Sequence, residues 1–568
     1  MFFIHEQQRT GKGELAFWGI ALLAMSILVS FPFFSAHHVL LGQDLAFHLG
    51  RIEGIAEGLR GGQLPVRINP VQLGGYGMPT EIFYPNLFLY LPALLRLAGV
   101  PLIASWDVLN IFLNLVTAFA GWWGFSVLFR SSRTGAVASL CYLVGLYRLI
   151  MMYDGAGLGV LQGMAFLPAA LAAIWATLQR EAACWPAAVF FTVCIFLSHI
   201  LSSLFLVLAA GIMLVLSLPR FLRADVRHAV GKSCGFVALL TIWFYAPFLY
   251  FQHTMDYVIK QWTHREVVYE SIHPPASLDW FLGSAFLLLL ICLALWMIFH
   301  LRRAQAHSFF FFLAAAVGIV ALVSHPAPWH VLGTAVGVIQ FPARLLVFAQ
   351  MAASMAAALG LAAVGLGTAK RRVGVVLCVF TIFGANCLYL SGYRYAVPLQ
   401  PREQDVLPAM ARVGIDRALP QMDFAYGGYK DYMDTETLKK MTGGASSASL
   451  VDAALQEKFR DTGIHPDDRI EKIDRIGNDF RLQAAAGAPA AIQLPVFWYD
   501  GYRADSPAGS VTAFRDDDGQ VSIRLPAEAC SVHVWYAGLP WFFWTDMISL
   551  FSLPFFVYVS QHFLKPAS

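Results

Sequence analysis

Residues Leu15–Phe34, LAFWGIALLAMSILVSFPFF, form a run of 20 residues without a charged side chain. A helix needs about 20 mostly apolar residues to cross the hydrocarbon core of a bilayer. Basic residues precede the run, and the Ser35-Ala36 that follows it is a poor signal-peptidase site. We therefore expect an uncleaved first membrane span.

The composition indicates that most of the chain resembles this first run. Apolar residues make up 58% of the 568 residues, charged residues make up 13%, and the mean hydropathy is +0.60. A soluble globular chain is about 25% charged. The net charge of +3 gives no reason to expect a nucleic-acid partner. No Walker motif is present, so we expect no use of ATP. The eight cysteines show no CxxC pair or Cys/His ligand spacing, so we expect no disulfide framework.

Hydrophobic runs predict an all-α polytopic bundle of about 12 transmembrane helices. The segment Ile82–Leu97 is also apolar, but Pro85, Pro92 and Arg96 interrupt it, and we interpret it as a re-entrant or interfacial helix. The expected spans are 15–34, 105–129, 134–150, 158–178, 183–200, 202–219, 233–250, 279–300, 308–324, 343–367, 373–391 and 541–563.

Basic residues in the short loops set the expected orientation. With a cytoplasmic N-terminus, every short basic loop falls inside, as the positive-inside rule requires. These loops contain Arg130 and Arg133, Arg180, Arg220 to Lys232, Arg302 and Arg303, and Lys370 to Arg372. We expect both termini in the cytoplasm and the loops 35–104, 151–157, 251–278, 325–342 and 392–540 outside, in a bacterial cytoplasmic (inner) membrane.

The predicted organisation has three parts: a transmembrane domain over 1–391 whose outer loop 35–104 carries interfacial helices, an extracytoplasmic domain over 392–540, and a final span with a short tail over 541–568. The soluble domain holds 21 of the 36 acidic residues. We expect an α+β domain with helices at Glu403–Val413 and Ser446–Arg460, followed by a β-sandwich. Its predicted strands are Ala490–Trp498, Val521–Leu525 and Ser531–Tyr536, with a turn at Asp516–Gly519.

Asp44 and His48 open the first outer loop four residues apart, so a helix would place them on one face. Such a carboxylate and imidazole can share a proton or hold a metal ion. The alternative is an interfacial helix with an ordinary acidic start, whose apolar side chains (Leu45, Ile52, Ile55, Ala56 and Leu59) rest on lipid.

Three further residues lie at the expected outer ends of spans. Asp154 stands in a short loop, where it is either functional or a turn-forming Asp-Gly. His199 lies between two spans, where a packing role is the more common one for histidine. Arg344 begins a span and could bind phosphate bidentately or serve as an interface anchor.

These features resemble the layout of the polytopic GT-C glycosyltransferases, which take sugars from polyprenyl-phosphate donors. Asp44 and Asp154 stand where that superfamily has its two acids, and Phe83-Tyr84-Pro85-Asn86-Leu87 resembles its Tyr-Pro-Pro-Leu segment. A closer resemblance is to the bacterial YfhO-like membrane proteins ("6-pyruvoyl-tetrahydropterin synthase-related"). Its motifs, which also include Leu494–Tyr502, are Asp44-x-x-x-His48, Leu73–Gly77, Ser198-His199 and Gln340-Phe341-Pro342-Ala343-Arg344, where Ala343 replaces the usual Trp.

The resemblance implies transfer of a sugar from a polyprenyl-phosphate donor to an envelope glycan, lipid or polymer at the outer membrane face. In that scheme Asp44 is the general base, His48 orients it or shares the proton, and Asp154 orients the acceptor. Arg344 holds the donor phosphate, with Arg51 and Arg148 as further candidates, and Tyr84, Gln340 and His199 belong to the same lipid-phosphate site. Asp44, His48 and Asp154 could instead hold a divalent cation (Mg or Mn), although they form an incomplete ligand set.

Two other functions stay open from the sequence. A bundle of about 12 spans could export a lipid-linked saccharide, although transporters usually place ionisable groups near the membrane midplane. The chain could also be a non-catalytic envelope-assembly protein, in which Asp44 would be dispensable.

Overall fold

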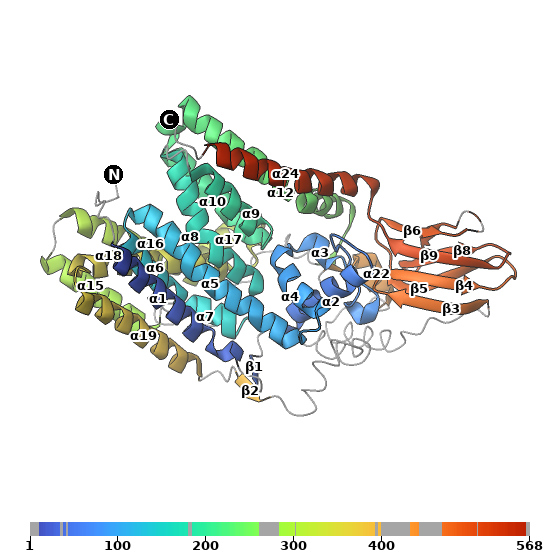
Figure 1. The fold of residues 1–568 in the computed structure, drawn as a ribbon, viewed down its shortest axis with the longest axis horizontal. Helices are drawn as coiled ribbons and strands as arrows, with labels where there is room; N and C mark the ends of the chain where they lie inside the picture. The colour runs from blue at the N-terminus through green and yellow to red at the C-terminus, as the bar shows by residue number, and fades with distance from the viewer. Residues whose placement is uncertain are drawn as a thin grey trace.

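A computed structural model describes residues 11–34, 38–40, 44–179, 184–258, 260, 283–300, 303–391, 396–398, 432–441, 469–507, 509 and 511–563. A helical bundle occupies one end of the molecule and a β-sandwich the other, with the helices of the first outer loop between them (Figure 1). The predicted helices Glu403–Val413 and Ser446–Arg460 lie outside the described residues. The fold class predicted from the sequence, a polytopic helical bundle with a β-sandwich domain near the C-terminal end, is confirmed.

Within the described residues, eight helices are long and apolar enough to cross a membrane, and a helix pair bent by 44° makes a ninth when it is counted as one span. The bent pair consists of α6 and α7 and corresponds to the predicted span 134–150. Three other predicted spans, 183–200, 202–219 and 279–300, contain the shorter helices α9, α10 and α15. Together with 134–150, four predicted spans are therefore not single long helices. The bundle helices are α1 (Lys12–Val29), α5 (Leu102–Phe129), α6 (Ser132–Leu143), α7 (Leu146–Tyr153), α8 (Leu158–Leu178), α9 (Trp185–Phe196), α10 (Ile200–Leu216), α11 (Leu218–Phe221), α12 (Ala224–Thr254), α15 (Ser284–His300), α16 (Arg303–Ser324), α17 (Ala327–Leu332), α18 (Leu346–Val364), α19 (Ala369–Ser391) and α24 (Pro540–Phe563).

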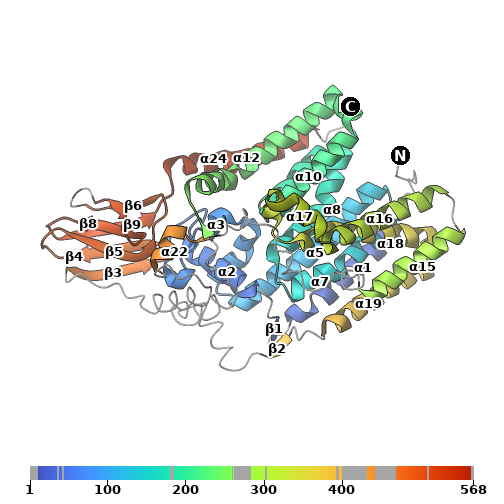
Figure 2. The same cartoon turned by 180° about the vertical axis from the view of Figure 1, so that it is seen from behind.

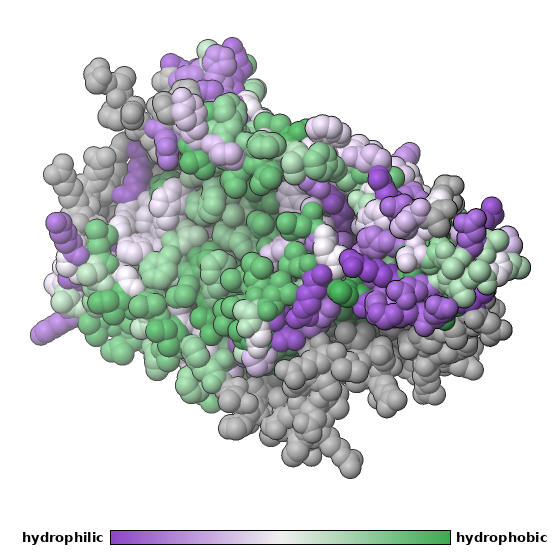
Figure 3. Space-filling model, turned by 45° about the vertical axis from the view of Figure 1, so that its right-hand side comes forward, coloured by the Kyte–Doolittle hydropathy of each residue, from purple (hydrophilic) through white to green (hydrophobic). Residues whose placement is uncertain are grey.

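The surface hydropathy follows this division. Apolar residues cover the bundle, and hydrophilic residues gather at its far end and over the opposite end of the molecule (Figure 3). Large apolar side chains are exposed on the bundle helices, such as Phe551 on α24 and Ile212 on α10, at 69% and 62%. A lipid environment accounts for such exposure, because water would penalise it. The chain is therefore a membrane protein.

The first outer loop folds into short helices between bundle and sandwich. They are α2 (Leu45–Arg60), η2 (Leu73–Gly75), α3 (Thr80–Phe83), η3 (Leu87–Leu89) and α4 (Tyr90–Leu97). The segment Ile82–Leu97 does not form a span, as predicted. The prediction that the apolar face of α2 rests on lipid is wrong: Leu45, Ile52, Ile55 and Ala56 are at most 3% exposed and pack in the protein core.

The β-sandwich consists of two antiparallel sheets, with strand orders β3-β4-β9-β6 and β5-β8-β7. The predicted strands are present, one from an apolar run as β5 and two from alternation as β8 and β9. The predicted turn closes with a hydrogen bond from the Gly519 amide to the Asp516 carbonyl. The strands are β3 (Ile470–Ile476), β4 (Asp479–Ala484), β5 (Ala490–Phe497), β6 (Tyr502–Asp505), β7 (Ala513–Arg515), β8 (Gln520–Leu525) and β9 (Cys530–Tyr536).

The sandwich shares one hydrophobic core with the first outer loop. Ile68, Met78 and Phe83 of the loop join Phe480 and Val496 of the sandwich in a single buried cluster. Backbone contacts reinforce this core, since the Phe497 amide donates to the Tyr76 carbonyl. The described parts of the first outer loop and of the sandwich therefore pack against each other through one core.

Two more connections tie distant parts of the chain together. Strands β1 (His38–Leu40) and β2 (Ala396–Pro398) pair antiparallel, and they lie at the bundle edge nearest the outer loop in both views (Figures 1 and 2). Helix α24 leaves the sandwich and runs beside α12, and its Asp546 pairs with Arg67 of the outer loop at 2.6 Å.

Candidate active site

Asp44 caps the N-terminus of α2 and lies beside the second outer loop. Its amide donates to the Gly155 carbonyl at 3.0 Å, and its own carbonyl accepts the first helical bond from His48. The carboxyl is partly exposed, yet enough protein surrounds it that burial raises its pKa to about 6, against a smaller opposing effect of the nearby Arg344 charge. A carboxyl with this pKa is suited to accept a proton near neutral pH.

His48 lies one turn further along α2 and is 1% exposed. Its ring is stacked on Trp106, with centroids 6.1 Å apart and planes 17° from parallel, and its Nδ1 has no hydrogen-bond partner among the residues that the structure describes. Burial lowers the pKa of this imidazole well below its usual range, and the positive charge of Arg51 adds to the effect. A neutral His48 can orient neighbouring groups, but it does not store a proton.

Arg51 is committed to a buried ion pair. Its Nη2 donates to Glu81 at 2.8 Å and to the carbonyls of Tyr84 and Pro85, both at 3.0 Å, and its Nε donates to Glu81 at 3.2 Å. The side chain is fully buried. Arg51 therefore fixes the segment that carries Tyr84. The sequence predicted a phosphate contact for Arg51, but in the structure its guanidinium is bonded to protein groups.

Tyr84 stands at the centre of the predicted residues. Its ring lies 4.3 Å from the Arg51 guanidinium carbon, and its centroid lies 6.1 Å from that of His48 and 5.8 Å from that of His199. Burial raises the Tyr84 pKa to about 12, so the hydroxyl stays protonated and can donate. A Cβ at Gly159, in the first turn of α8, would collide with this hydroxyl and with the His199 ring.

His199 caps α10 with its side chain. Its Nδ1 accepts from the Ser202 amide at 3.3 Å and lies 2.9 Å from the Ser202 hydroxyl. An Nδ1 that accepts from a backbone amide leaves the proton of a neutral imidazole on Nε2. The sequence allowed a packing role or a ligand role, and this geometry combines a helix cap with an N–H donor beside Tyr84.

Arg344 begins the span that contains α18, on the short helix η6 (Pro342–Leu345). Its Nη1 donates to the Gln340 side-chain oxygen at 2.9 Å and to the Ile339 carbonyl at 3.2 Å, and the guanidinium carbon lies 5.0 Å from the Phe341 ring centroid. Gln340 has a φ of 59°, which is strained for a residue with a Cβ. The Gln-Phe-Pro-Ala-Arg motif thus fixes the position of the Arg344 side chain, and Gln340 contributes by accepting a hydrogen bond from it.

The Arg344 guanidinium interacts electrostatically with Asp44, Tyr84 and Tyr147, and also with the His199 ring. Five predicted residues therefore meet at the outer-loop end of the bundle. We refer to Asp44, His48, Tyr84, His199 and Arg344 as the outer-face cluster.

Arg148 and Asp154 stand apart from this cluster in different ways. The Arg148 side chain is fully buried in the bundle and donates to Asn114 at 2.6 Å and to Thr117 at 3.3 Å, so the structure does not place it for the predicted phosphate contact. Asp154 ends α7 next to Gly155, which binds the Asp44 amide, and burial raises its pKa. Asp154 is thus a neighbour of Asp44 through the backbone.

The predicted metal site is not assembled in the part of the chain that the structure describes. No three His, Cys, Asp or Glu side chains there lie close enough together to hold a metal ion. His48 is buried and stacked on Trp106, and a divalent cation at Asp44, His48 and Asp154 stays a prediction.

Two residues of the site were missed by sequence reasoning. Glu81 balances the Arg51 charge, and Tyr147 lies near Arg344. A lone Glu in the apolar segment Thr80–Phe83 was a signal for a buried ion pair, since an unpaired carboxylate is expensive there. Tyr147 lies in an apolar run and gave no comparable signal.

No family model and no curated protein matches the sequence. Three solved structures are similar in arrangement. The arabinofuranosyltransferase AftD from Mycobacteria matches 70% of this chain with a TM-score of 0.45 and 13% identity, and this chain spans 28% of the length of AftD. ArnT from Cupriavidus metallidurans, solved with undecaprenyl phosphate, matches 78% of this chain and 76% of its own, with a TM-score of 0.40 and 12% identity.

The archaeal oligosaccharyltransferase AglB from Archaeoglobus fulgidus, solved with an inhibitory peptide and a dolichol-phosphate, matches 79% of this chain and 60% of its own. Its TM-score is 0.38 and its identity 11%. At these sequence identities and TM-scores the three structures assign neither a family nor an activity to this chain.

Proposed function

We propose that this chain is a membrane glycosyltransferase that moves a sugar from a polyprenyl-phosphate-linked donor to a cell-envelope acceptor at the outer face of the bacterial inner membrane. The observation that carries the proposal is the environment of Asp44, a partly exposed carboxyl whose pKa is raised to about 6 and which lies within electrostatic range of the half-buried Arg344 at the outer-loop end of a membrane bundle. A base and a cation so placed match the two demands of sugar transfer, which are proton removal from an acceptor and stabilisation of a leaving phosphate.

In this mechanism the acceptor hydroxyl attacks the anomeric carbon while Asp44 takes its proton. The bond from the anomeric carbon to the phosphate oxygen breaks, and the polyprenyl phosphate leaves with the bonding electrons. Arg344 stabilises the negative charge of that leaving group, and the neutral Tyr84 hydroxyl and the His199 Nε2–H are donors beside it. A single displacement inverts the anomeric configuration.

The remaining predicted residues take supporting roles. Arg51 fixes Tyr84 through the pair with Glu81, and Gln340 holds Arg344. The neutral His48 packs beneath Tyr84 and Trp106. Asp154 orients the acceptor from the loop that holds the Asp44 amide. No step of the mechanism runs through a metal ion.

The direct test is sugar transfer by the reconstituted full chain, given a panel of labelled undecaprenyl-phosphate sugars and an envelope extract as acceptor. Asp44→Asn should slow the release of label from the lipid about 10²–10⁴-fold, the usual contribution of a general base. The matched control is Asp505→Asn, an exposed acid on β6 whose loss should leave the rate unchanged.

A raised folded-state pKa also predicts that Asp44→Asn does not destabilise the protein. A carboxyl whose pKa is higher in the folded than in the unfolded state stabilises folding below its unfolded pKa and loses that stabilisation as pH rises through about 6. At pH 7.5 the ionised Asp44 therefore opposes folding, and its replacement should keep or raise the melting temperature.

Equal transfer by wild type and a folded Asp44→Asn variant would remove Asp44 from the chemistry, and movement of intact lipid-linked sugar without transfer would favour the export function.

A further inference from the structure

The helix α22 (Thr435–Met441) and the three residues before it lie between the sandwich and the outer-loop helices in both views (Figures 1 and 2). Met433 is 1% exposed and belongs to the core that the outer loop and the sandwich share. We call Tyr432–Met441 the clamp segment. The clamp segment is far in sequence from the residues of the outer-face cluster, but its contacts bring it near them.

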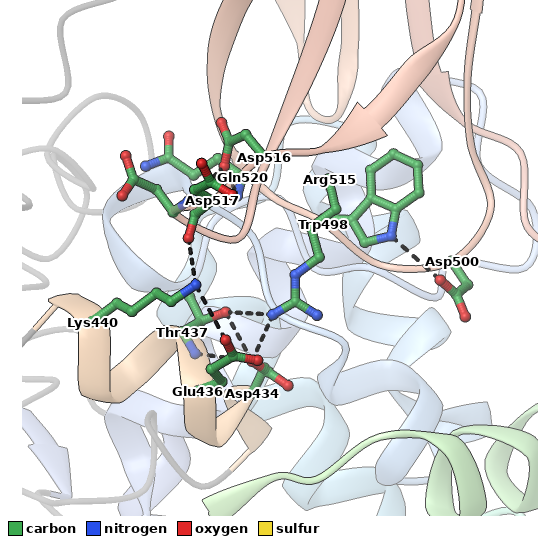
Figure 4. Close-up of polar contacts among 11 residues, drawn as sticks. Asp434, Glu436, Thr437, Lys440, Trp498, Asp500, Arg515, Asp516, Asp517 and Gln520 are labelled. Carbon is green, nitrogen blue, oxygen red and sulfur yellow. Dashed lines mark hydrogen bonds and ion pairs between the residues drawn. The ribbon is translucent and has the colours of Figure 1, made fainter.

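One side of the clamp segment is fastened to the β7–β8 end of the sandwich (Figure 4). The Asp434 carboxylate accepts from Arg515 Nη2 at 3.0 Å and from the Thr437 amide at 2.9 Å, and Lys440 Nζ donates to the Asp517 carbonyl at 2.6 Å. The Thr437 side chain lies against Gly519, whose φ of 77° and lack of a Cβ permit this approach. The clamp segment is thus held to the sandwich by an ion pair at Asp434 and by close packing at Thr437, less than one helical turn away.

The other side of the clamp segment is fastened to the residues that follow α12. The Thr435 amide donates to the Asp256 carbonyl at 2.9 Å, and the Val258 amide donates to the Met433 carbonyl at 3.1 Å. An isolated antiparallel bridge joins Tyr257 to Asp434. Backbone bonds on one side and side-chain bonds on the other leave Tyr432 little freedom to move.

Tyr432 comes first in the clamp segment and packs against the outer-loop helix α3. Its ring is stacked on Phe83, with centroids 5.6 Å apart and planes 8° from parallel, and Phe83 directly precedes Tyr84. The Tyr432 hydroxyl also interacts electrostatically with the Arg344 guanidinium. An aromatic side chain from the C-terminal domain is therefore packed on the residue before Tyr84 and lies within electrostatic range of the cation that the mechanism assigns to the leaving phosphate.

We propose that Tyr432 is a donor-phosphate-binding residue, and that the β-sandwich, through Arg515 and Asp434, holds it at the anion site of Arg344. The ligand class is a lipid-linked phosphate monoester, and the assignment rests on the proposed function. A phosphate oxygen that accepts from a guanidinium has further lone pairs, and a protonated phenol close to the guanidinium is a suitable second donor. Arg515 and Asp434 are positioning residues, since neither reaches the site itself.

The first measurement is the affinity of the reconstituted protein for undecaprenyl phosphate, without any sugar or acceptor. Tyr432→Phe keeps the stacking on Phe83 and removes only the hydroxyl, so binding should weaken about tenfold, as expected for one hydrogen bond to a charged group. Arg344→Gln should weaken it further. Arg515→Gln should reproduce part of the Tyr432→Phe loss, Arg515→Lys should restore affinity, and Arg524→Gln on the neighbouring strand β8 is the matched control.

The second measurement needs no ligand. Hydrogen–deuterium exchange at the amides of Val258 and Thr435 should accelerate in Arg515→Gln and return toward the wild-type rate in Arg515→Lys, because both amides are bonded across the clamp segment. Unchanged exchange in Arg515→Gln would overturn the role of the sandwich in holding the segment.

The outcomes separate this inference from the proposed function. Binding of undecaprenyl phosphate that depends on Tyr432, without transfer of any sugar, would support the inference and count against the transferase. Transfer by wild type with an unchanged affinity in Tyr432→Phe would support the transferase and overturn the inference. Absence of undecaprenyl phosphate binding by the wild-type protein would overturn the phosphate assignment of Tyr432.

Discussion

Asp44 makes a pH prediction at the scale of a single residue. Its pKa of about 6 means that the carboxyl is protonated, and unable to act as a base, at lower pH. Transfer measured as kcat/KM should therefore fall about tenfold for each pH unit below 6 and level off above about 7. A pH profile between 4.5 and 8 checks this. An acidic limb with its midpoint near 4 would mean that the base is an ordinary exposed carboxyl, and so not Asp44.

The side chains of the arginines show what sequence spacing can and cannot reveal. Asp44 is the N-cap of α2 and His48 lies one turn further along, so the helix that their spacing predicted is present, and Asp44 lies within electrostatic range of Arg344. Arg51 and Arg148 were equally plausible phosphate ligands by position, yet both are fully buried with polar partners. Those partners, Glu81 and Asn114, are 30 and 34 residues away, and no local pattern encodes such a pairing.

At the scale of elements, the outer-loop helices depend on the Arg51–Glu81 pair. Glu81→Gln should lower the free energy of unfolding by about 3–5 kcal/mol, because it leaves a buried guanidinium without its counter-charge. Thermal or denaturant unfolding in detergent measures this. Glu57→Gln, which breaks a more exposed pair with Arg60 in the same loop, is the control and should change stability by less than about 1 kcal/mol.

The double variant Arg51→Met with Glu81→Leu tells a stability role from a role in orienting Tyr84. Replacement of both charges should recover most of the lost stability, since no charge remains buried. Transfer activity should stay low, because Arg51 also binds the Tyr84 and Pro85 carbonyls. Full recovery of activity would show that the pair has no part in placing Tyr84.

Elements were predictable where one physical signal dominates. The span 158–178 appears with the same bounds as α8, because length and hydropathy decide it. Alternation of apolar and polar residues predicted β8 and β9, and a continuous apolar run predicted β5. The bend between α6 and α7 was not predicted, because the mean hydropathy of the run 134–150 favours one span although Gly145 and Arg148 interrupt it. The Arg148 side chain turns inward to Asn114 beside the break. The apolar face of α2 was assigned to lipid because composition cannot tell lipid from a protein neighbour.

At the scale of the whole molecule, the helices predict which parts of the chain are accessible from each side of the membrane. The start of α12 and the sandwich lie at opposite ends of the molecule. An impermeant maleimide should label an Asp505→Cys variant, on β6, in intact spheroplasts. It should label Arg223→Cys, directly before α12, only after permeabilisation. Labelling of both in intact spheroplasts would refute the orientation expected from the positive-inside rule.

The contacts between the first outer loop and the C-terminal end have a consequence for biosynthesis. Arg67 and its partner Asp546 are 479 residues apart, so at roughly 5–20 residues per second the ribosome completes the partner about 25–100 seconds later. During that interval the loop lacks the strands and the helix that complete its core. Chains that terminate before Asp546 would thus leave Arg67 without its partner and the outer loop without the strands and the helix that pack against it.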